Sequence, residues 1–361
     1  MKSIRGSVII LFVFLALSCA SRPVVRKTAA EEEKPLERAL RSVKMNSPRI
    51  IKFLEPREAI LTGSGYSKVG GIEARGEFSM DGNDYRVSYF FSNAYEIEEN
   101  LYHISFCLED LTNNTAHYDA LRWSPGEEDA GLLLSFDDYF WDMWRSYFFL
   151  FDAYGAKITF FVQGSLDPES ADESGLEDFC AEALGRGHSL GFHTVNHLDL
   201  RKEPPDVFYS ETVEAALVFA NRGIHFSAIA FPFGFSEPWM RDTLAEFFHF
   251  TRGYGTNIRI YDRENSNNGY IVSKAIDNIV YRDEGKFKND IRKILLAAKF
   301  TGQCFVPFTT HEISDEADWG ITPQRLEYVL KTARDLRLKF YTYGSIGDFF
   351  PALRYTQAEQ N

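Results

Sequence analysis

The chain reads Leu132-Leu133-Leu134-Ser135-Phe136-Asp137-Asp138 where a long alternation of apolar and helical segments begins. An apolar run of this length is typical of a strand that is buried on both faces of a parallel sheet. Two carboxylates follow it directly. We therefore expect a buried strand that delivers Asp137 and Asp138 at its carboxyl end.

Apolar runs and helical segments continue to alternate after this strand. Expected helices are Tyr139–Tyr154, Leu176–Gly185, Asp206–Ala220, Lys286–Lys299 and Pro323–Leu336, and expected strands are Lys157–Val162, Phe226–Phe231, Cys304–Thr310 and Lys339–Thr342. This alternation favours a layered or barrel α/β fold. Because the carboxyl ends of strands line the site in such architectures, we expect four side chains to meet there, namely Asp137, Asp138, His193 and His311.

The region before the α/β segment is rich in short strands. The turn Asp81-Gly82-Asn83-Asp84 leads into Tyr85–Phe90 with partial alternation, which is a hairpin signal, and Tyr102–Phe106 again has apolar residues at alternate positions. We predict a small β-rich, sandwich-like domain over residues 46–125 and an α/β domain over residues 126–361. The β-rich domain contains no catalytic cluster.

The first residues indicate export. Lys2 and Arg5 precede the apolar run Val8–Leu17, which is too short to span a bilayer and fits a secretory signal. Ala16-Leu17-Ser18-Cys19 resembles the lipobox of bacterial lipoproteins, with Ala16 where that pattern prefers Leu. We interpret residues 1–18 as a signal peptide and 19–45 as a tether, with a lipid anchor at Cys19 on the periplasmic or outer surface. Ordinary secretion with cleavage near Ala20 is the alternative.

Composition narrows the class of protein. The 361 residues are 45% hydrophobic and 15% aromatic, enough for a sizeable core. The formal net charge of −13 argues against a nucleic-acid partner, which would require a basic surface. Apart from Cys19, the cysteines Cys107, Cys180 and Cys304 stand among apolar neighbours, and neither a disulfide framework nor a cysteine zinc site is indicated. We expect buried thiols, with room for one bridge.

Three residues form a candidate metal site. Asp138, His193 and His197 provide one carboxylate and two imidazoles, a set that suits zinc or another divalent first-row metal and leaves positions for water and substrate. The spacing of four between the histidines allows both rings to reach one ion. Taken alone, the pair would more often be two histidines without a metal, and Asp137 a helix cap. Their combination indicates a metal-dependent hydrolase.

Residues Gly131–Phe350 resemble the polysaccharide deacetylases of carbohydrate esterase family four, which carry the NodB-homology domain. Ser135-Phe136-Asp137-Asp138 is similar to the first family motif, His193-Thr194-Val195-Asn196-His197 to the second, and Phe231-Pro232-Phe233-Gly234 to part of the third. Thr159–Val162 and the strand ending in His311 also correspond. The resemblance implies a deformed (β/α) barrel with fewer than eight strands.

The resemblance also implies roles. Asp137 would be the general base toward the attacking water and His311 the general acid toward the leaving amine, which requires a pKa near the working pH. The backbone N–H of Phe233 would help to stabilise the oxyanion. The implied cofactor is a divalent metal, first of all Zn²⁺, with Co²⁺, Ni²⁺ or Mn²⁺ as other options.

The chain departs from the family pattern at several positions. Ala230 stands where the third motif often has an Arg that pairs with the base, and we expect Arg252 to replace that charge. Asp277 is the nearest candidate for orienting His311, because the usual fourth motif is missing. Thr309 occupies the place of an apolar residue against the acetyl methyl. Trp319 either stacks on a sugar or packs on its own domain.

The expected function is that of a hydrolase that removes acetyl groups, first of all N-acetyl groups, from an acetylated polysaccharide or oligosaccharide of the cell envelope or the extracellular space. Glycan O-deacetylation is the nearest variant. The alternative class is a glycan-binding envelope lipoprotein that kept the fold and lost turnover. The sequence names neither the glycan nor the oligomeric state.

Overall fold

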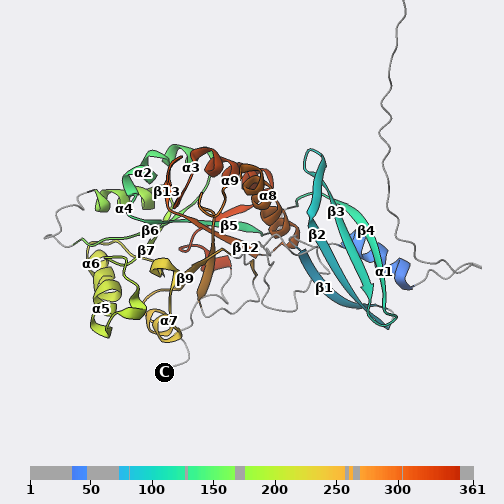
Figure 1. Ribbon diagram of the computed structural model, residues 1–361, viewed down its shortest axis with the longest axis horizontal. Helices are drawn as coiled ribbons and strands as arrows, with labels where there is room; N and C mark the ends of the chain where they lie inside the picture. Colours follow the sequence, from blue (N-terminus) through green and yellow to red (C-terminus); the bar gives the residue numbers. More distant parts are fainter. Residues whose placement is uncertain are drawn as a thin grey trace, which may run out of the picture.

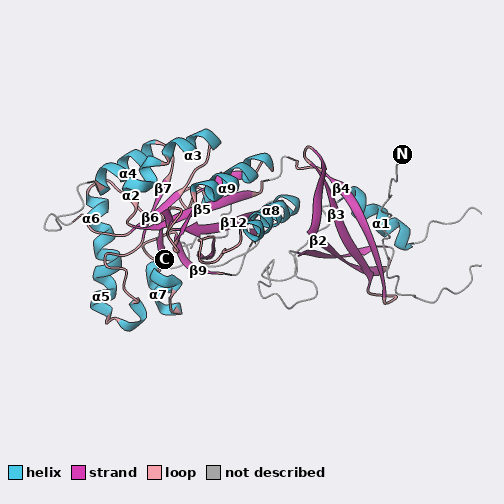
Figure 2. Ribbon diagram, turned by 45° about the horizontal axis from the view of Figure 1, so that its top comes forward, coloured by secondary structure: helices cyan, strands magenta, loops and turns pink. Residues whose placement is uncertain are grey.

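The computed structural model describes residues 35–46, 73–80, 82–126, 129–166, 175–256, 260–262, 269–302 and 304–349. Two units lie side by side, a large α/β unit and a smaller antiparallel sheet (Figure 1). Helix α8 (Glu284–Thr301) lies between them in both ribbon views (Figure 2). The signal run, Cys19 and most of the predicted tether lie outside the described residues.

The α/β unit is a barrel of parallel strands. Its strands follow one another as β5 (Gly131–Asp138), β6 (Thr159–Val162), β7 (Ser189–Phe192), β8 (Ala228–Ala230), β9 (Phe250–Gly255), β11 (Tyr270–Ala275) and β12 (Cys304–Thr310). Pairing of β12 with β5 closes the ring. The described strands thus form the seven-stranded deformed (β/α) barrel that the resemblance implied.

Three short pairings complete the sheets of this unit. β15 (Lys339–Tyr341) pairs with the first half of β5, on the N-terminal side of the residues that pair with β6. β10 (Tyr261–Asp262) pairs with the start of β12 in antiparallel orientation. β13 (Glu312–Ile313) and β14 (Gly320–Ile321) form a separate parallel pair just beyond His311.

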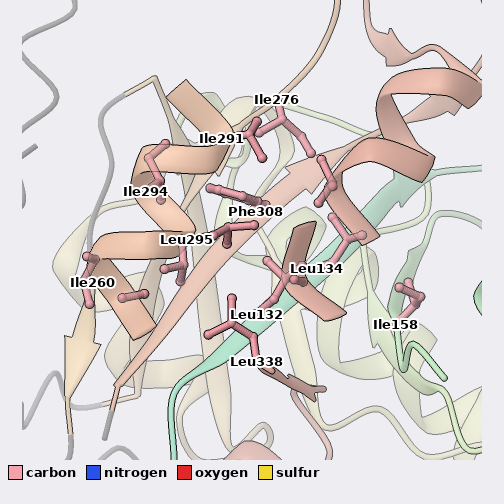
Figure 3. Close-up of a cluster of buried hydrophobic side chains, with 14 of the residues drawn as sticks. Leu132, Leu134, Ile158, Ile260, Ile276, Ile291, Ile294, Leu295, Phe308 and Leu338 are labelled. Atoms are coloured by element: carbon pink, nitrogen blue, oxygen red, sulfur yellow. The ribbon is translucent and has the colours of Figure 1, made fainter. Parts of the chain in front are cut away.

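Helices cover the outside of the barrel. They are α2 (Trp141–Ser146), α3 (Phe148–Tyr154), α4 (Leu176–Gly185), α5 (Pro205–Tyr209), α6 (Ala215–Asn221), α7 (Pro238–Leu244), α8 and α9 (Pro323–Asp335). The short helix α10 (Ile346–Phe349) instead contributes Ile346 to the cluster inside the barrel. Figure 3 shows Leu132 and Leu134 of β5 against Ile291, Ile294 and Leu295 of α8. Leu133, between them in sequence, belongs instead to the inner cluster with Phe161 and Tyr343. This alternation explains why Leu132, Leu133 and Leu134 are all apolar although they point to opposite faces of the strand.

The smaller unit is one antiparallel sheet in the described residues. Its order is β1 (Glu73–Met80), β2 (Asn83–Glu98), β3 (Leu101–Asp110) and β4 (Thr115–Trp123). The predicted hairpin is present, with Met80 paired to Asn83. Helix α1 (Pro35–Asn46), which lies in the predicted tether, contacts β2. The β-rich region is therefore confirmed, as a single sheet rather than two facing sheets.

Several predicted elements differ in detail. The predicted helix Tyr139–Tyr154 is two helices that meet at Tyr147. The predicted helix Asp206–Ala220 contains a π-helical turn, Ser210–Glu214. Strands β4, β9 and β11 were not predicted, because polar and glycine residues interrupt their apolar positions.

Two further expectations concern cysteines and membranes. Cys107, Cys180 and Cys304 are buried free thiols, so no pair of them is bridged. Within the described part of the chain, no helix combines the length and the apolar character that crossing a bilayer requires. The predicted domain boundaries stay predictions.

Candidate functional site

The predicted site residues meet at the carboxyl ends of the barrel strands. Asp137 and Asp138 end β5, His193 follows β7, and His311 follows β12. Arg252 lies within β9, and Phe233 lies in the short turn Pro232–Gly234 after β8. Parallel strands place these ends at one rim of the barrel.

The three predicted metal ligands converge. Oδ1 of Asp138 lies 3.4 Å from Nε2 of His193 and 3.5 Å from Nε2 of His197. One ligand atom from each residue lies within 4.8 Å of the other two. His193 and His197 come from a loop after β7, residues 193–197, which we call the His loop. Here a strained loop, and not a helix face, brings the two rings together.

The donor set fits a divalent metal. Oδ1 of Asp138 is buried without a hydrogen-bond partner, a costly state that a cation would relieve. Nδ1 of His193 lies 3.0 Å from the carbonyl oxygen of Ala230, which leaves Nε2 as the lone-pair nitrogen toward Asp138. Burial, then the neighbouring His193, lowers the pKa of His197, and a neutral imidazole is the form that binds metal.

The Asp138 carboxylate stays ionised at neutral pH. Burial by itself would raise its pKa, but the neighbouring imidazoles, His193 first, outweigh burial and lower the pKa of Asp138 to about 2. Asp138 has a backbone φ of 87°, in the left-handed region. Such strain in a residue other than glycine is held by its surroundings and is frequent at functional sites.

Asp137 forms a buried ion pair with Arg252. Nη2 of Arg252 donates to Oδ2 of Asp137, and both side chains are almost fully buried. Arg252 is the register partner of Ala230, so strand β9 supplies the guanidinium that strand β8 lacks. Thr309 also donates to Asp137, over 3.3 Å. The expected contact between Arg252 and the candidate base is present.

Both the ring and the backbone carbonyl group of His311 have polar neighbours. Its Nδ1 lies 3.0 Å from Oδ1 of Asp277, and its Nε2 lies 4.0 Å from Oδ2 of Asp137. Trp144 donates its indole N–H to the carbonyl oxygen of His311. Asp277 is thus the partner that the sequence suggested for orienting this ring.

The acid form of His311 is favoured. Burial lowers its pKa, but the charge and hydrogen bond of Asp277, together with the other site carboxylates, raise the pKa to about 9. Asp277 also accepts hydrogen bonds from Thr310 over 2.7 Å and from Tyr254 over 3.1 Å. These donors fix the carboxylate that holds the imidazolium.

Two exposed aromatic rings flank the site. Phe233, 51% exposed and at a φ of 58°, has its ring centroid 4.6 Å from that of His197. Trp319, 53% exposed, lies 6.0 Å from the ring of His311. His197 and His311 therefore each have an aromatic neighbour that remains accessible to solvent.

The family comparison agrees with the geometry. Residues 125–247 match a family model described as polysaccharide deacetylase. The matched segment is thus similar to the polysaccharide deacetylase family. The resemblance inferred from the motifs is thereby confirmed, and the enzyme class is that of a hydrolase. The matched segment holds both Asp residues and the His loop, and Arg252, Asp277 and His311 follow it.

Solved structures of similar proteins include three deacetylases. A putative polysaccharide deacetylase from Mycobacterium smegmatis is 15% identical, with 64% of this chain and 93% of that chain covered and a TM-score of 0.45. Peptidoglycan deacetylase PdaC from Bacillus subtilis is 12% identical, with 63% of this chain and 93% of that chain covered and a TM-score of 0.42. The chitin deacetylase from the fungus Colletotrichum lindemuthianum is 13% identical, with 62% of this chain and 88% of that chain covered and a TM-score of 0.42. No curated protein matches the chain.

Some residues of the candidate site were not found from the sequence. Tyr254 and Thr310 contact Asp277, and Glu211 contacts the His loop. Thr309, which stands where the family has an apolar residue, donates its hydroxyl to Asp137. No local motif marks these residues, because each contact joins elements that are distant in sequence.

Proposed function

We propose that this protein is a metal-dependent deacetylase that removes N-acetyl groups from an amino-sugar polysaccharide or oligosaccharide of the cell envelope. One observation carries the proposal: three groups of side chains meet at the rim formed by the carboxyl ends of the barrel strands. They are the candidate metal ligands Asp138, His193 and His197 and two pairs of a carboxylate with a basic side chain, Asp137–Arg252 and Asp277–His311. Amide hydrolysis requires Lewis acidity, a base toward water and an acid toward the leaving amine.

Zinc is the proposed ion, held by Asp138, His193 and His197. It would supply the Lewis acidity that polarises the acetyl carbonyl and acidifies a water molecule. Asp137 would accept a proton from the attacking water, and the Arg252 guanidinium holds the Asp137 carboxylate in place. The backbone N–H of Phe233 is the proposed donor to the developing oxyanion.

His311 completes the reaction as the proton donor. An amine is a poor leaving group unless its nitrogen is protonated, and His311 is charged at neutral pH because of Asp277. This requirement favours an N-acetyl substrate over an O-acetyl one. The exposed faces of Phe233 and Trp319 are suitable for stacking on sugar rings at the two sides of the reacting group.

Export and anchoring belong to the same proposal. The basic start, the short apolar run and Cys19 support a lipoprotein whose deacetylase domain works outside the inner membrane. Mass spectrometry of the wild-type chain and the Cys19→Ala variant tests the anchor. A mass increase of diacylglyceryl size that Cys19→Ala removes is the expected result, and identical processing of both proteins would argue for ordinary secretion.

The test of the activity is acetate release by the zinc-loaded protein from a panel of acetylated glycans. The panel pairs N-acetylated oligosaccharides with O-acetylated polymers. We expect release from the N-acetylated members, and release confined to O-acetylated members would replace the proposed substrate class. The inactive glycan binder has no observation in its favour, since Arg252 supplies the charge that Ala230 lacks. It would become the better account if folded, zinc-loaded protein bound glycan without any release.

A further inference from the structure

Glu211 contacts the His loop from outside the site. It lies in the π-helical turn Ser210–Glu214, and its side chain is 4% exposed. Its Oε2 accepts hydrogen bonds from the backbone N–H groups of Val195, over 3.1 Å, and Asn196, over 2.8 Å. Its Oε1 accepts from the side-chain amide of Asn196 over 2.5 Å. The carboxylate therefore binds the middle of the loop whose two ends are His193 and His197.

The His loop needs such an anchor, because its backbone is strained. Thr194 has a φ of 65° and His197 a φ of 55°, so two non-glycine residues in one short loop adopt the left-handed region. Each such residue costs about 1 to 2 kcal/mol and persists only where the surroundings hold it. Within the loop, Thr194 accepts from the backbone N–H of His197. Glu211 supplies the constraint from a different element.

The surroundings of Glu211 point to positioning rather than to packing. Among the described residues, no Lys, Arg or His lies within ion-pair distance of its carboxylate, so the loop's N–H groups are what satisfy the buried charge. A buried carboxylate is costly without such donors, and an apolar side chain would fill the same space at lower cost. The turn that holds Glu211 is π-helical, a local distortion that often occurs at functional sites.

We infer that Glu211 is a positioning residue that holds the His loop in its metal-binding conformation and thereby raises the affinity of the deacetylase domain for its divalent ion. The inference rests on the proposed metal site. Glu211 does not touch the reacting atoms. It fixes Val195 and Asn196, so that both imidazoles converge with Asp138.

The experiment compares Glu211→Gln with Glu214→Gln in the full-length protein. Glu214 is exposed on the same π-helical turn, and is the matched control. The dissociation constant for Zn²⁺ is measured by competition with a chromophoric chelator, and Co²⁺ is used as a spectroscopic probe of ligand geometry. We expect Glu211→Gln to weaken zinc binding by about tenfold or more and to alter the Co²⁺ absorption bands, whereas Glu214→Gln leaves both unchanged.

A swap variant separates positioning from folding. In Glu211→Gln, the carbonyl oxygen can still accept from the two backbone N–H groups, but the new NH2 group meets the NH2 group of Asn196 unless the Asn196 amide turns over. Adding Asn196→Asp restores an acceptor opposite the new donor, so the double variant should regain much of the lost affinity. Should Glu211→Gln fail to fold, Asn196→Ala serves instead, because it removes a single hydrogen bond at an exposed position and should weaken zinc binding to a smaller degree.

The outcomes distinguish this inference from the proposed function. If the wild-type protein binds zinc and folded Glu211→Gln binds it equally well with the same Co²⁺ spectrum, Glu211 has no positioning role. If Glu211→Gln weakens binding but Asn196→Asp gives no recovery and Asn196→Ala has no effect, the loop contact is not the cause and the inference is overturned. If the wild-type protein binds no divalent metal, the proposed function itself fails.

Discussion

Arg252 and Asp137 form an ion pair with almost no exposure to solvent. Removing one partner of such a pair leaves an uncompensated buried charge, which costs about 3 to 5 kcal/mol. We therefore expect Arg252→Met to lower the free energy of unfolding by that amount and to reduce turnover by about a hundredfold, while the folded fraction still binds zinc. Denaturant unfolding and acetate release measure the two effects.

The control for this pair is the double variant Asp137→Asn with Arg252→Met. It contains no unpaired charge, so its stability should recover most of the loss, while its turnover should not recover. A double variant as unstable as Arg252→Met would show that the guanidinium stabilises the protein through contacts other than Asp137, such as the ring of Phe161 beneath it.

His311 gives a prediction about pH. Its pKa is raised to about 9 chiefly because Asp277 opposes the effect of burial, so it is protonated below that pH and loses the proton as pH rises. Asp277→Asn removes the negative charge and lowers the pKa of His311. The alkaline limb of kcat against pH should therefore move to lower pH. Asp318→Asn, an exposed carboxylate paired with Arg282, is the control that should leave the profile in place. An unmoved limb in Asp277→Asn would remove His311 from the role of acid.

The site residues that lie in local sequence motifs could be predicted from the sequence. Asp137, Asp138, His193, His197 and His311 were all expected at one rim, and the structure places them there. The expected role of Arg252 rested only on its position in the chain, because the register of strands β8 and β9 cannot be read from the sequence. Glu211 and Tyr254 could not be found, because a single Glu or Tyr carries no local signal of its distant partner.

At the scale of elements, the turn Pro232–Gly234 is fitted closely against strand β9. Gly234 has a φ of 72°, and a Cβ there would lie 2.6 Å from the backbone nitrogen of Tyr254. Gly234→Ala should push the turn, and with it Phe233, away from the site. We expect lower kcat with zinc binding retained.

Gly223 provides a matched control for that substitution. Its φ is 79°, yet a Cβ there would meet nothing within 4 Å. Gly223→Ala therefore carries the backbone cost of about 1 kcal/mol without the clash, and should lower stability slightly without lowering kcat. Equal kcat for the two variants would mean that the turn tolerates the displacement and that Phe233 is not needed in its present place.

Strands were predicted best where both of their faces are buried. β5 and β12 both begin with apolar runs, since one set of side chains faces the helices and the other the barrel interior. β9 and β11 were missed because Arg252, Tyr254, Ser273 and Lys274 break their apolar pattern. Arg252 and Tyr254 contact site carboxylates, so the polar residues that obscured β9 are the ones that complete the site.

At the scale of the whole molecule, Phe300 near the end of α8 joins the two units. Its ring lies 4.7 Å from that of Tyr89, 5.4 Å from that of Phe91 and 5.2 Å from that of Trp123. Phe300 precedes the start of β12, whereas His311 follows its end, roughly 20 Å away at the rise of a strand. The antiparallel sheet thus packs far from the site along β12.

We expect Phe300→Ala to cost about 3 to 5 kcal/mol of stability, as for other buried aromatic residues, and to leave kcat and KM of the folded protein unchanged. Phe149→Ala, at a position 67% exposed, should be nearly neutral in stability. Urea unfolding followed by both fluorescence and acetate release makes the comparison. A fall in kcat for folded Phe300→Ala would mean that the sheet supports the site after all.

The sequence indicated two regions but not their shared core. Residues of both units belong to one buried cluster, including Tyr89, Phe106, Phe300 and Leu132. Such a contact depends on tertiary packing between segments that are far apart in the chain, and periodicity within either segment carries no information about it.

The most direct test of the proposed metal-dependent deacetylase is acetate release from an N-acetylated oligosaccharide through a cycle of chelation and zinc reconstitution, with Asp137→Asn measured in parallel. We expect acetate release to disappear on chelation, to return with one equivalent of zinc, and to stay absent in Asp137→Asn although that variant binds the zinc. Release that persists after chelation, or that Asp137→Asn retains in full, would contradict it.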